Sequence, residues 1–234
     1  MLYDEFTILL PTLNEAENVG GLIEKLTGSY EGIFIIVSDD GSIDNTKDVI
    51  SSFQNPRIFF LDRKNERIHG LTASILDASK MVKSKYFMVM DADTQHPWEA
   101  VKEITDNLKQ GIKLIIASRK KVIGRWPISR KSISYLGNIL GKISLLIRGK
   151  RYIGYDMLTG FFGVETNFWK RIVFAENNFI HFRLKGYKII FDFLKVIPHK
   201  TPVKNIYYIF NTRRRGSSKL NKKIYIEFLK ALFS

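Results

Sequence analysis

The sequence predicts an α/β fold in which a doubly wound, mostly parallel sheet carries helices on both faces. Short apolar runs alternate with stretches of helical periodicity through the first half of the chain. This alternating order is typical of parallel sheets. A length of 234 residues suits one large domain, so we expect residues 1–234 to form a single unit.

The strands and helices of the first half are expected in strict alternation. The predicted strands are residues 6–10, 33–37, 57–61, 86–90 and 114–117. The predicted helices are residues 13–26, 43–53, 71–82 and 97–108, the last with Pro97 in its first turn. In such sheets ligands bind beyond the carboxyl ends of the strands. The loops that follow the strands are therefore the candidate site.

Two amphipathic helices are expected in the second half, over residues 131–147 and 222–233. Each could turn its apolar face to the core. Each could equally lie as an interfacial helix among lipid headgroups, with basic side chains reaching the phosphates. Both interpretations stay open from the sequence.

Basic residues concentrate in the second half of the chain, whose formal net charge is +14. Residues 1–119 carry 13 basic and 18 acidic side chains, whereas residues 120–234 carry 24 basic and 5 acidic ones. The two halves therefore have different electrostatic roles. The basic half must meet something anionic, such as nucleic acid, a phosphorylated substrate or a membrane surface.

The composition also excludes several kinds of site. The chain has no cysteine, which rules out disulfides, thiolate metal sites and a cysteine nucleophile. Its four histidines form no helical pair of the kind that binds zinc. The first residues are acidic where a signal peptide needs basic ones, and no run of about 18 uncharged apolar residues predicts a transmembrane helix. We therefore expect a cytoplasmic protein.

The strongest motif is D-A-D-T-Q-H-P at residues 91–97, directly after an apolar strand. If strand geometry continues, Asp91 and Asp93 share a face, and Gln95 could join them. Paired carboxylates repel each other unless a cation lies between them, and hard oxygen ligands favour Mg²⁺ or Mn²⁺. The alternative is a solvated acidic turn.

Three further motifs carry polar or basic residues after strand-like segments: 10–15 (L-P-T-L-N-E), 38–46 (S-D-D-G-S-I-D-N-T) and 213–219 (R-R-R-G-S-S-K). A carboxylate of the second can accept a hydrogen bond from a nucleobase or cap a helix. The third suits a loop that binds phosphates, and its alternative is a nucleic-acid patch.

Together these motifs resemble the GT-A, family-2 glycosyltransferases, most of all the dolichol-phosphate mannose synthases of the polyprenyl-phosphate hexosyltransferase branch. The resemblance covers nearly the whole chain and includes D-x-x-T-G-F-F at residues 156–162. The D-A-D-x-Q-H-P and G-S-S-K motifs are the specific ones. Leu13 departs from the family, which usually has Tyr there, and residues 68–72 replace an N-x-G-L-G segment.

The resemblance implies metal binding by Asp91, Asp93 and Gln95, with Mg²⁺ or Mn²⁺ as cofactor. It implies catalytic roles for Asp91, Asp93, Arg119, Arg213 and Lys219. The implied nucleotide-sugar contacts are Pro11, Leu13, Glu15, Ser38, Asp40, Asp91, Ala92, Asp93, Gln95, Arg119, Asp156, Arg213 and Lys219. Residues 1–119 are then the nucleotide and metal half, and residues 120–234 the acceptor and membrane half.

The implied reaction is inverting transfer of a hexose, with mannose from GDP-mannose as first choice, to polyprenyl or dolichyl phosphate. A lipid monophosphate needs no general base, because its second pKa is about 6 and its oxygen is already anionic at neutral pH. Arg119, with Arg125 or Arg130, is the candidate for holding that phosphate. We expect a peripheral protein on the cytoplasmic face of a membrane, with a small membrane-anchoring subunit as an option.

Three alternatives remain. The donor could be a UDP-hexose, either glucose or an N-acetylhexosamine. The acceptor could be a hydroxyl group, which would need a carboxylate base such as Asp156 or Asp192. A basic nucleic-acid-binding module is the alternative of another class, and the paired acidic residues on the loops disfavour it.

Overall fold

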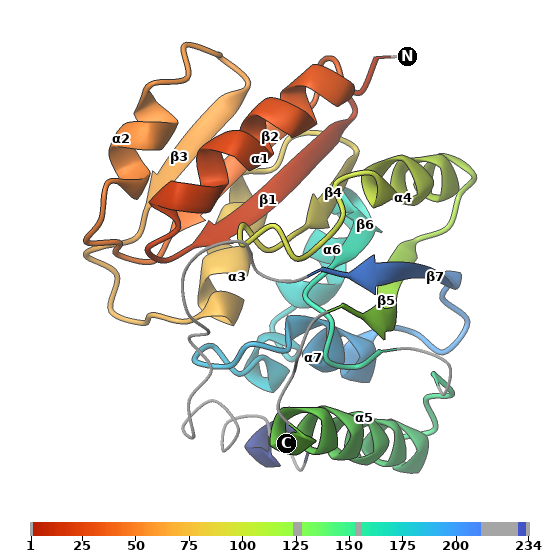
Figure 1. Ribbon diagram of the computed structural model, residues 1–234. Helices are drawn as coiled ribbons and strands as arrows, with labels where there is room; N and C mark the ends of the chain where they lie inside the picture. The colour runs from red at the N-terminus through yellow and green to blue at the C-terminus, as the bar shows by residue number, and fades with distance from the viewer. Residues whose placement is uncertain (1, 124–127, 153–155, 212–228, 233–234) are drawn as a thin grey trace.

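The computed structural model describes residues 2–123, 128–152, 156–211 and 229–232. Seven strands form one sheet in the order β3-β2-β1-β4-β6-β5-β7 (Figure 1). They are β1 (Phe6–Thr12), β2 (Phe34–Asp39), β3 (Ile58–Asp62), β4 (Tyr86–Val89), β5 (Leu114–Val122), β6 (Phe162–Glu165) and β7 (Val203–Phe210). Strand β6 runs antiparallel to both of its neighbours, and every other pairing is parallel. The predicted mostly parallel sheet is therefore confirmed.

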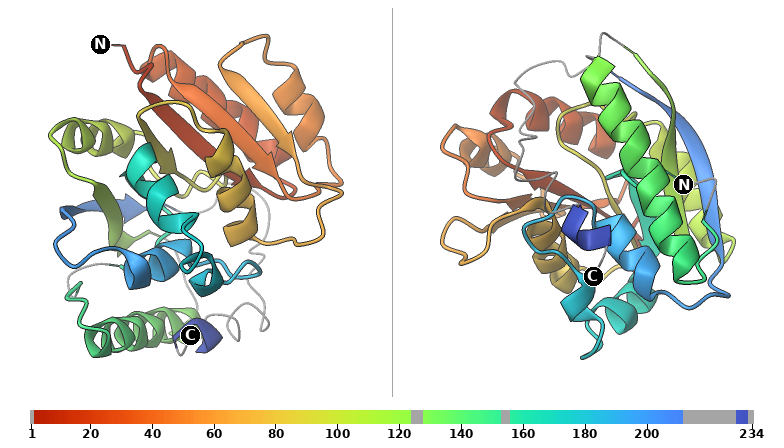
Figure 2. Two further views of the ribbon diagram at one scale, coloured as in Figure 1. Left: turned by 180° about the vertical axis from the view of Figure 1, so that it is seen from behind. Right: turned by 90° about the horizontal axis from the view of Figure 1, so that it is seen from below.

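Helices cover both faces of this sheet (Figure 1, Figure 2). One face packs against α1 (Ala16–Ser29), α2 (Thr46–Ser51) and α4 (Ala100–Lys109). The other packs against α3 (Leu71–Met81), α6 (Thr166–Val173) and α7 (Ile189–Val196). A short 3₁₀ turn, η1 (Phe179–His181), precedes α7. The central strands β1 and β4 are buried at every position, as expected where helices cover both faces of a sheet.

All five predicted strands and four predicted helices are present, with shifted ends. The helix expected from residue 13 begins at Ala16, because Asn14 adopts a left-handed backbone conformation with φ 52° that no α-helix accommodates. The helix expected from Pro97 begins at Ala100. Strand β6 is not predicted by the sequence, because its four residues are too few for a periodic signal.

The amphipathic helix expected over residues 131–147 is α5 (Ile128–Ile147). Its inner side packs on the domain, where Leu145 is fully buried and Gly141 lies against Met157. Its outer side exposes apolar residues, among them Leu136 at 56% and Ile147 at 80%. The helix thus has a core-facing side and a second apolar side that faces solvent.

The expected helix over residues 222–233 lies mostly outside the described residues. Residues 229–232 are helical and lie beside α5 (Figure 2), where the Ser144 hydroxyl donates to the carbonyl of Leu232 at 2.7 Å. Among the described residues, no helix combines the length and apolar composition needed to cross a bilayer.

Candidate functional site

The predicted site loops meet at one edge of the sheet. Strands β1, β2 and β4 are parallel, with Thr12 paired to Asp39 and Leu9 paired to Val89. Their carboxyl ends therefore lie side by side, and the segments 11–15, 38–46 and 91–97 all leave the sheet at this edge (Figure 1). This is the place where parallel sheets bind ligands.

The D-A-D-T-Q-H-P segment forms a tight turn directly after β4. Thr94 takes a left-handed conformation with φ 62°, and the Gln95 amide donates to Asp93 Oδ1 at 3.1 Å. The side chain of Asp91 is 34% exposed, whereas Asp93 is buried at 6%. The turn thus has a partly exposed carboxylate, that of Asp91, beside the buried carboxylate of Asp93, which is hydrogen-bonded to the backbone of the turn.

These residues fit a divalent cation whose remaining ligands come from a substrate. No group of three or more His, Asp or Glu within the described ranges could enclose a metal ion. Mg²⁺ needs only one or two protein carboxylates when phosphate oxygens complete its shell. Gly160 lies directly against this carboxylate, since a Cβ there would be only 3.0 Å from Asp91 Oδ1, so a residue without a side chain is needed beside Asp91.

Gln95 joins the turn to the end of β7. Its Nε2 donates to the carbonyl of Asn211 at 3.0 Å, and the Asn211 amide donates back to the Gln95 carbonyl at 2.9 Å. The side chain predicted to join the metal site therefore also ties the turn to the residue after β7.

The two aspartates after β2 have different partners. Asp39 closes the loop, since its carboxylate accepts from the Thr12 hydroxyl at 2.9 Å and from the Ser42 amide at 2.8 Å. Asp40 forms an ion pair with Arg63 and accepts from the Gly70 amide at 2.7 Å. Burial raises the pKa of Asp40, and these donors oppose that rise.

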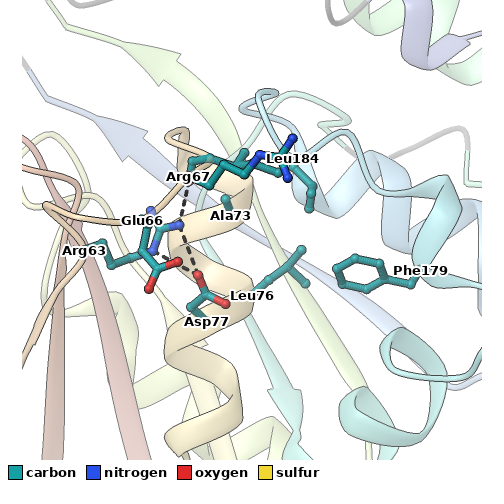
Figure 3. A pocket seen from close by; sticks show the side chains of 9 residues that line it. Arg63, Glu66, Arg67, Ala73, Leu76, Asp77, Phe179 and Leu184 are labelled. Atoms are coloured by element: carbon teal, nitrogen blue, oxygen red, sulfur yellow. Dashed lines mark hydrogen bonds and ion pairs between the residues drawn. The ribbon is translucent and has the colours of Figure 1, made fainter.

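Arg63 is a residue that the sequence did not single out. It is 2% exposed and also pairs with Asp77 on α3 at 3.0 Å. A lone arginine after a strand carries no pattern that predicts such a role. It borders a hollow of about 190 Å³ between α3 and the segment 179–184, in which Arg63 and Asp77 point toward each other (Figure 3).

The remaining predicted nucleotide contacts belong mostly to the framework of the site. Pro11 and Ala92 are buried, and Ser38 is buried against α3, where its hydroxyl donates to the Ser74 carbonyl at 3.0 Å. Glu15 is also buried and accepts from the Asn18 amide group at 2.8 Å. Leu13 is exposed at 36% on the β1–α1 loop.

Arg119 and Asp156 form a two-bond ion pair across 37 residues of sequence. Arg119 Nε donates to Oδ2 at 2.6 Å and Nη2 donates to Oδ1 at 3.1 Å. Burial disfavours the charged form of both side chains, but the attraction between the two charges outweighs the effect of burial. The pKa of Arg119 is therefore raised and that of Asp156 lowered. The pair keeps a permanent cation beside the candidate site.

Asn138 on α5 and Lys188, directly before α7, hold the segment that follows Asp156. Asn138 Oδ1 on α5 accepts from the Met157 amide at 2.7 Å, and Lys188 donates to the Leu158 carbonyl. Neither residue belongs to a recognisable motif. Arg125, Arg213 and Lys219 lie outside the described residues, as does the side chain of Arg130.

Comparison with known proteins agrees with this arrangement. Residues 7–178 match the family described as Glycosyl transferase family 2. The chain is 29% identical over 233 residues to the dolichol-phosphate mannosyltransferase of Pyrococcus furiosus, covering 97% of this chain and 62% of that relative. It is 25% identical over 244 residues to the dolichol-phosphate mannosyltransferase of Saccharomyces cerevisiae, covering 97% and 85%. The chain thus spans less than two thirds of the archaeal relative.

Among solved structures, glucosyl-3-phosphoglycerate synthase from Mycobacterium tuberculosis, in complex with Mn²⁺, uridine diphosphate and glucosyl-3-phosphoglycerate, has a TM-score of 0.67. That match covers 97% of this chain and 78% of the other at 14% identity, so it is a likeness of fold. The predicted GT-A type α/β fold is confirmed. With the family match extending from β1 through α6, the chain belongs to glycosyl transferase family 2.

Proposed function

We propose that this protein is a metal-dependent glycosyltransferase that moves a hexose from a nucleotide sugar to a polyprenyl phosphate. GDP-mannose and dolichyl phosphate are the first choices of donor and acceptor. The observation that carries the proposal is the Asp91–Asp93 turn, which lies at the carboxyl edge of a family-2 sheet. Similarity to two dolichol-phosphate mannosyltransferases over 97% of the chain supports the choice of substrates.

Asp91 and Asp93 would hold Mg²⁺ or Mn²⁺, with Gln95 as a further ligand. When bound, the cation would neutralise the diphosphate that leaves the donor. The buried parts of the β1 and β2 loops would shape the nucleotide pocket, and Asp40 would lie near the base. We assign residues 1–119 to the donor and residues 120–234 to the acceptor, within a single domain.

The acceptor phosphate oxygen would attack the anomeric carbon as the bond to the nucleoside diphosphate breaks, with inversion at that carbon. This oxygen carries no proton that must be removed at neutral pH. Asp156 and Asp192, considered above as bases, are both engaged by cations, Arg119 and Lys195. The lowered pKa of Asp156 makes it a weaker base still.

Cations would hold the two anionic substrates together. Arg119 lies within the described site and stays charged. We assign Arg125 or Arg130 to the acceptor phosphate, and Arg213 and Lys219 to the diphosphate. Bringing two anions into one site is the main barrier that such cations lower.

The outer side of α5 supports attachment to a membrane surface. Leu136, Leu140, Ile143 and Ile147 are all exposed by 42% or more on one helix. An apolar stripe on a helix in the basic half suits the headgroup region of an anionic bilayer. We propose a peripheral protein on the cytoplasmic face, with or without a small anchoring subunit.

The test is transfer of a labelled sugar into the lipid phase. The protein is incubated with Mn²⁺ or Mg²⁺, polyprenyl phosphate and, in separate samples, GDP-mannose, UDP-glucose and UDP-N-acetylglucosamine. We expect mannose to move. Transfer from a UDP sugar alone would replace the donor and keep the reaction class. A salt-dependent DNA gel shift without transfer from any donor would favour the nucleic-acid-binding alternative.

Asp91→Asn tests the role of the turn. It should lower the transfer rate by about 100-fold or more, because an amide cannot replace a carboxylate in neutralising the cation. The control is Asp106→Asn, which removes an exposed carboxylate paired with Lys102 on α4. Equal rates in the two variants would contradict the proposed site.

A further inference from the structure

His96 lies buried beneath the Asp91–Asp93 turn. It is 3% exposed, and its ring stacks on Phe161 with centroids 5.0 Å apart. Tyr208 and Phe210 of β7 make edge contacts with the same ring at 5.5 and 5.6 Å. The aromatic rings of three residues therefore enclose the imidazole of His96.

A hydrogen bond from the backbone determines which nitrogen of the ring carries the proton. The Asp91 amide donates to His96 Nδ1 at 3.1 Å. Nδ1 must therefore be the unprotonated nitrogen, and the proton lies on Nε2. Nε2 is 3.7 Å from Asp91 Oδ2, which is beyond direct hydrogen-bond length but adjacent to the carboxylate.

The carboxylate of Asp91 is therefore bordered by two residues. His96 accepts a hydrogen bond from the Asp91 amide and lies near Oδ2. Gly160 lies on the other side, where an added Cβ would be 3.0 Å from Oδ1 and 3.3 Å from Oδ2, so the carboxylate has little room to move. Phe161, directly after Gly160, stacks on the His96 ring. The ring and this segment thus form one packed unit around Asp91.

We propose that His96 is a positioning residue that fixes the backbone and carboxylate of Asp91 for a divalent cation. This inference rests on the proposed function, since it gives Asp91 the role of metal ligand. The imidazole suits this role, because Nδ1 accepts the hydrogen bond of the Asp91 amide while the ring packs on Phe161. Residues that orient metal ligands in this way typically change metal affinity by about 10- to 100-fold when mutated.

The test measures Mn²⁺ binding directly, by electron paramagnetic resonance titration of free Mn²⁺, with GDP or UDP in parallel samples. His96→Phe keeps an aromatic ring on Phe161 but cannot accept the Asp91 amide. We expect its Mn²⁺ affinity to fall by about 10-fold or more. His96→Asn places an amide oxygen near the position of Nδ1 and should keep most of the affinity. Tyr208→Phe is the packing control, and its affinity should match the wild type.

Each outcome decides the matter. Wild-type affinity in folded His96→Phe overturns the inference, as does an equal loss in His96→Phe and His96→Asn. If the phenylalanine variant does not fold, His96→Gln takes its place, because its longer side chain carries the amide away from Nδ1. Matching affinities in the Asn and Gln variants then overturn the inference. If the variants give one of these overturning results while the wild-type protein transfers sugar, only the role of His96 is refuted. If the wild-type protein neither binds Mn²⁺ nor transfers sugar, the proposed function is refuted as well.

Discussion

Replacing Asp156 with Asn should destabilise the protein by leaving the Arg119 guanidinium buried without its carboxylate. The two side chains are 14% and 9% exposed and share two hydrogen bonds. Removing one partner of a buried pair costs about 3–5 kcal/mol. The residual exposure places this pair near the lower limit, about 3 kcal/mol. For a chain of this length, that loss corresponds to a fall in Tm of about 6–12 °C.

Thermal and urea unfolding at pH 7 measure this loss. The lowered pKa of Asp156 means that its contribution is fully present above the unfolded value of about 3.9 and is lost as pH falls through the lower folded value. The difference in unfolding free energy between wild type and Asp156→Asn should therefore become smaller only in strong acid. Asp106→Asn, which breaks an exposed pair with Lys102, should change stability by less than about 1 kcal/mol.

A double-mutant cycle isolates the pair from other effects. Arg119→Met removes the charge that Asp156→Asn leaves behind, so the double variant should lose at least about 1 kcal/mol less than the sum of the single variants. Additive losses, or a loss below about 1 kcal/mol in Asp156→Asn, would refute the reasoning. The Arg119–Asp156 pair would then contribute no more to stability than an exposed ion pair does.

Two further substitutions test the packing of the fold. Gly163→Ala should lower the free energy of unfolding by about 1–3 kcal/mol, because a Cβ on β6 would collide with Ile104 of α4. Urea unfolding measures this loss, and Gly21→Ala is the control because the space around Gly21 is open. Equal effects of the two substitutions would contradict the predicted clash. Lys195→Met should destabilise by about 3–5 kcal/mol at pH 7, because it leaves the buried Asp192 carboxylate with the Arg183 amide but without its cationic partner. Burial raises the pKa of Asp192, so this carboxyl takes up a proton in acid. The stability lost in Lys195→Met should therefore grow as pH rises through the pKa of Asp192 in the folded protein. A loss of stability that does not change with pH would contradict this reasoning.

The sequence was most informative where local chemistry decides the outcome. Strands β1 and β4 are buried at every position and are mainly apolar because both faces of the sheet are covered, and this pattern is visible in a single segment. The position of Asp91 after β4 follows from the same pattern. The sequence was less informative about helix starts. The left-handed backbone at Asn14 depends on two hydrogen bonds with the loop after β2: the Asn14 amide donates to Ser42 Oγ, and the Ile43 amide donates to Asn14 Oδ1.

Partners far apart in the chain could not be predicted. Asp40 was expected near the base, and no sequence signal connects it with Arg63, which is 23 residues away. The burial of His96 depends on β7, more than a hundred residues later, and on Phe161. Such contacts depend on which strands become neighbours, and many pairings are compatible with the same apolar runs.

By itself, the sequence determined that this chain forms a mostly parallel α/β sheet with paired carboxylates at its carboxyl edge, because periodicity and the residues after each strand are local properties. Only the tertiary structure decided that antiparallel β6 lies between β4 and β5. That insertion brings Gly160 against Asp91 and allows Arg119 to meet Asp156. The physical reason is that strand order and burial are set by the packing of the whole chain, so the surroundings of each carboxylate exist only once the sheet is complete.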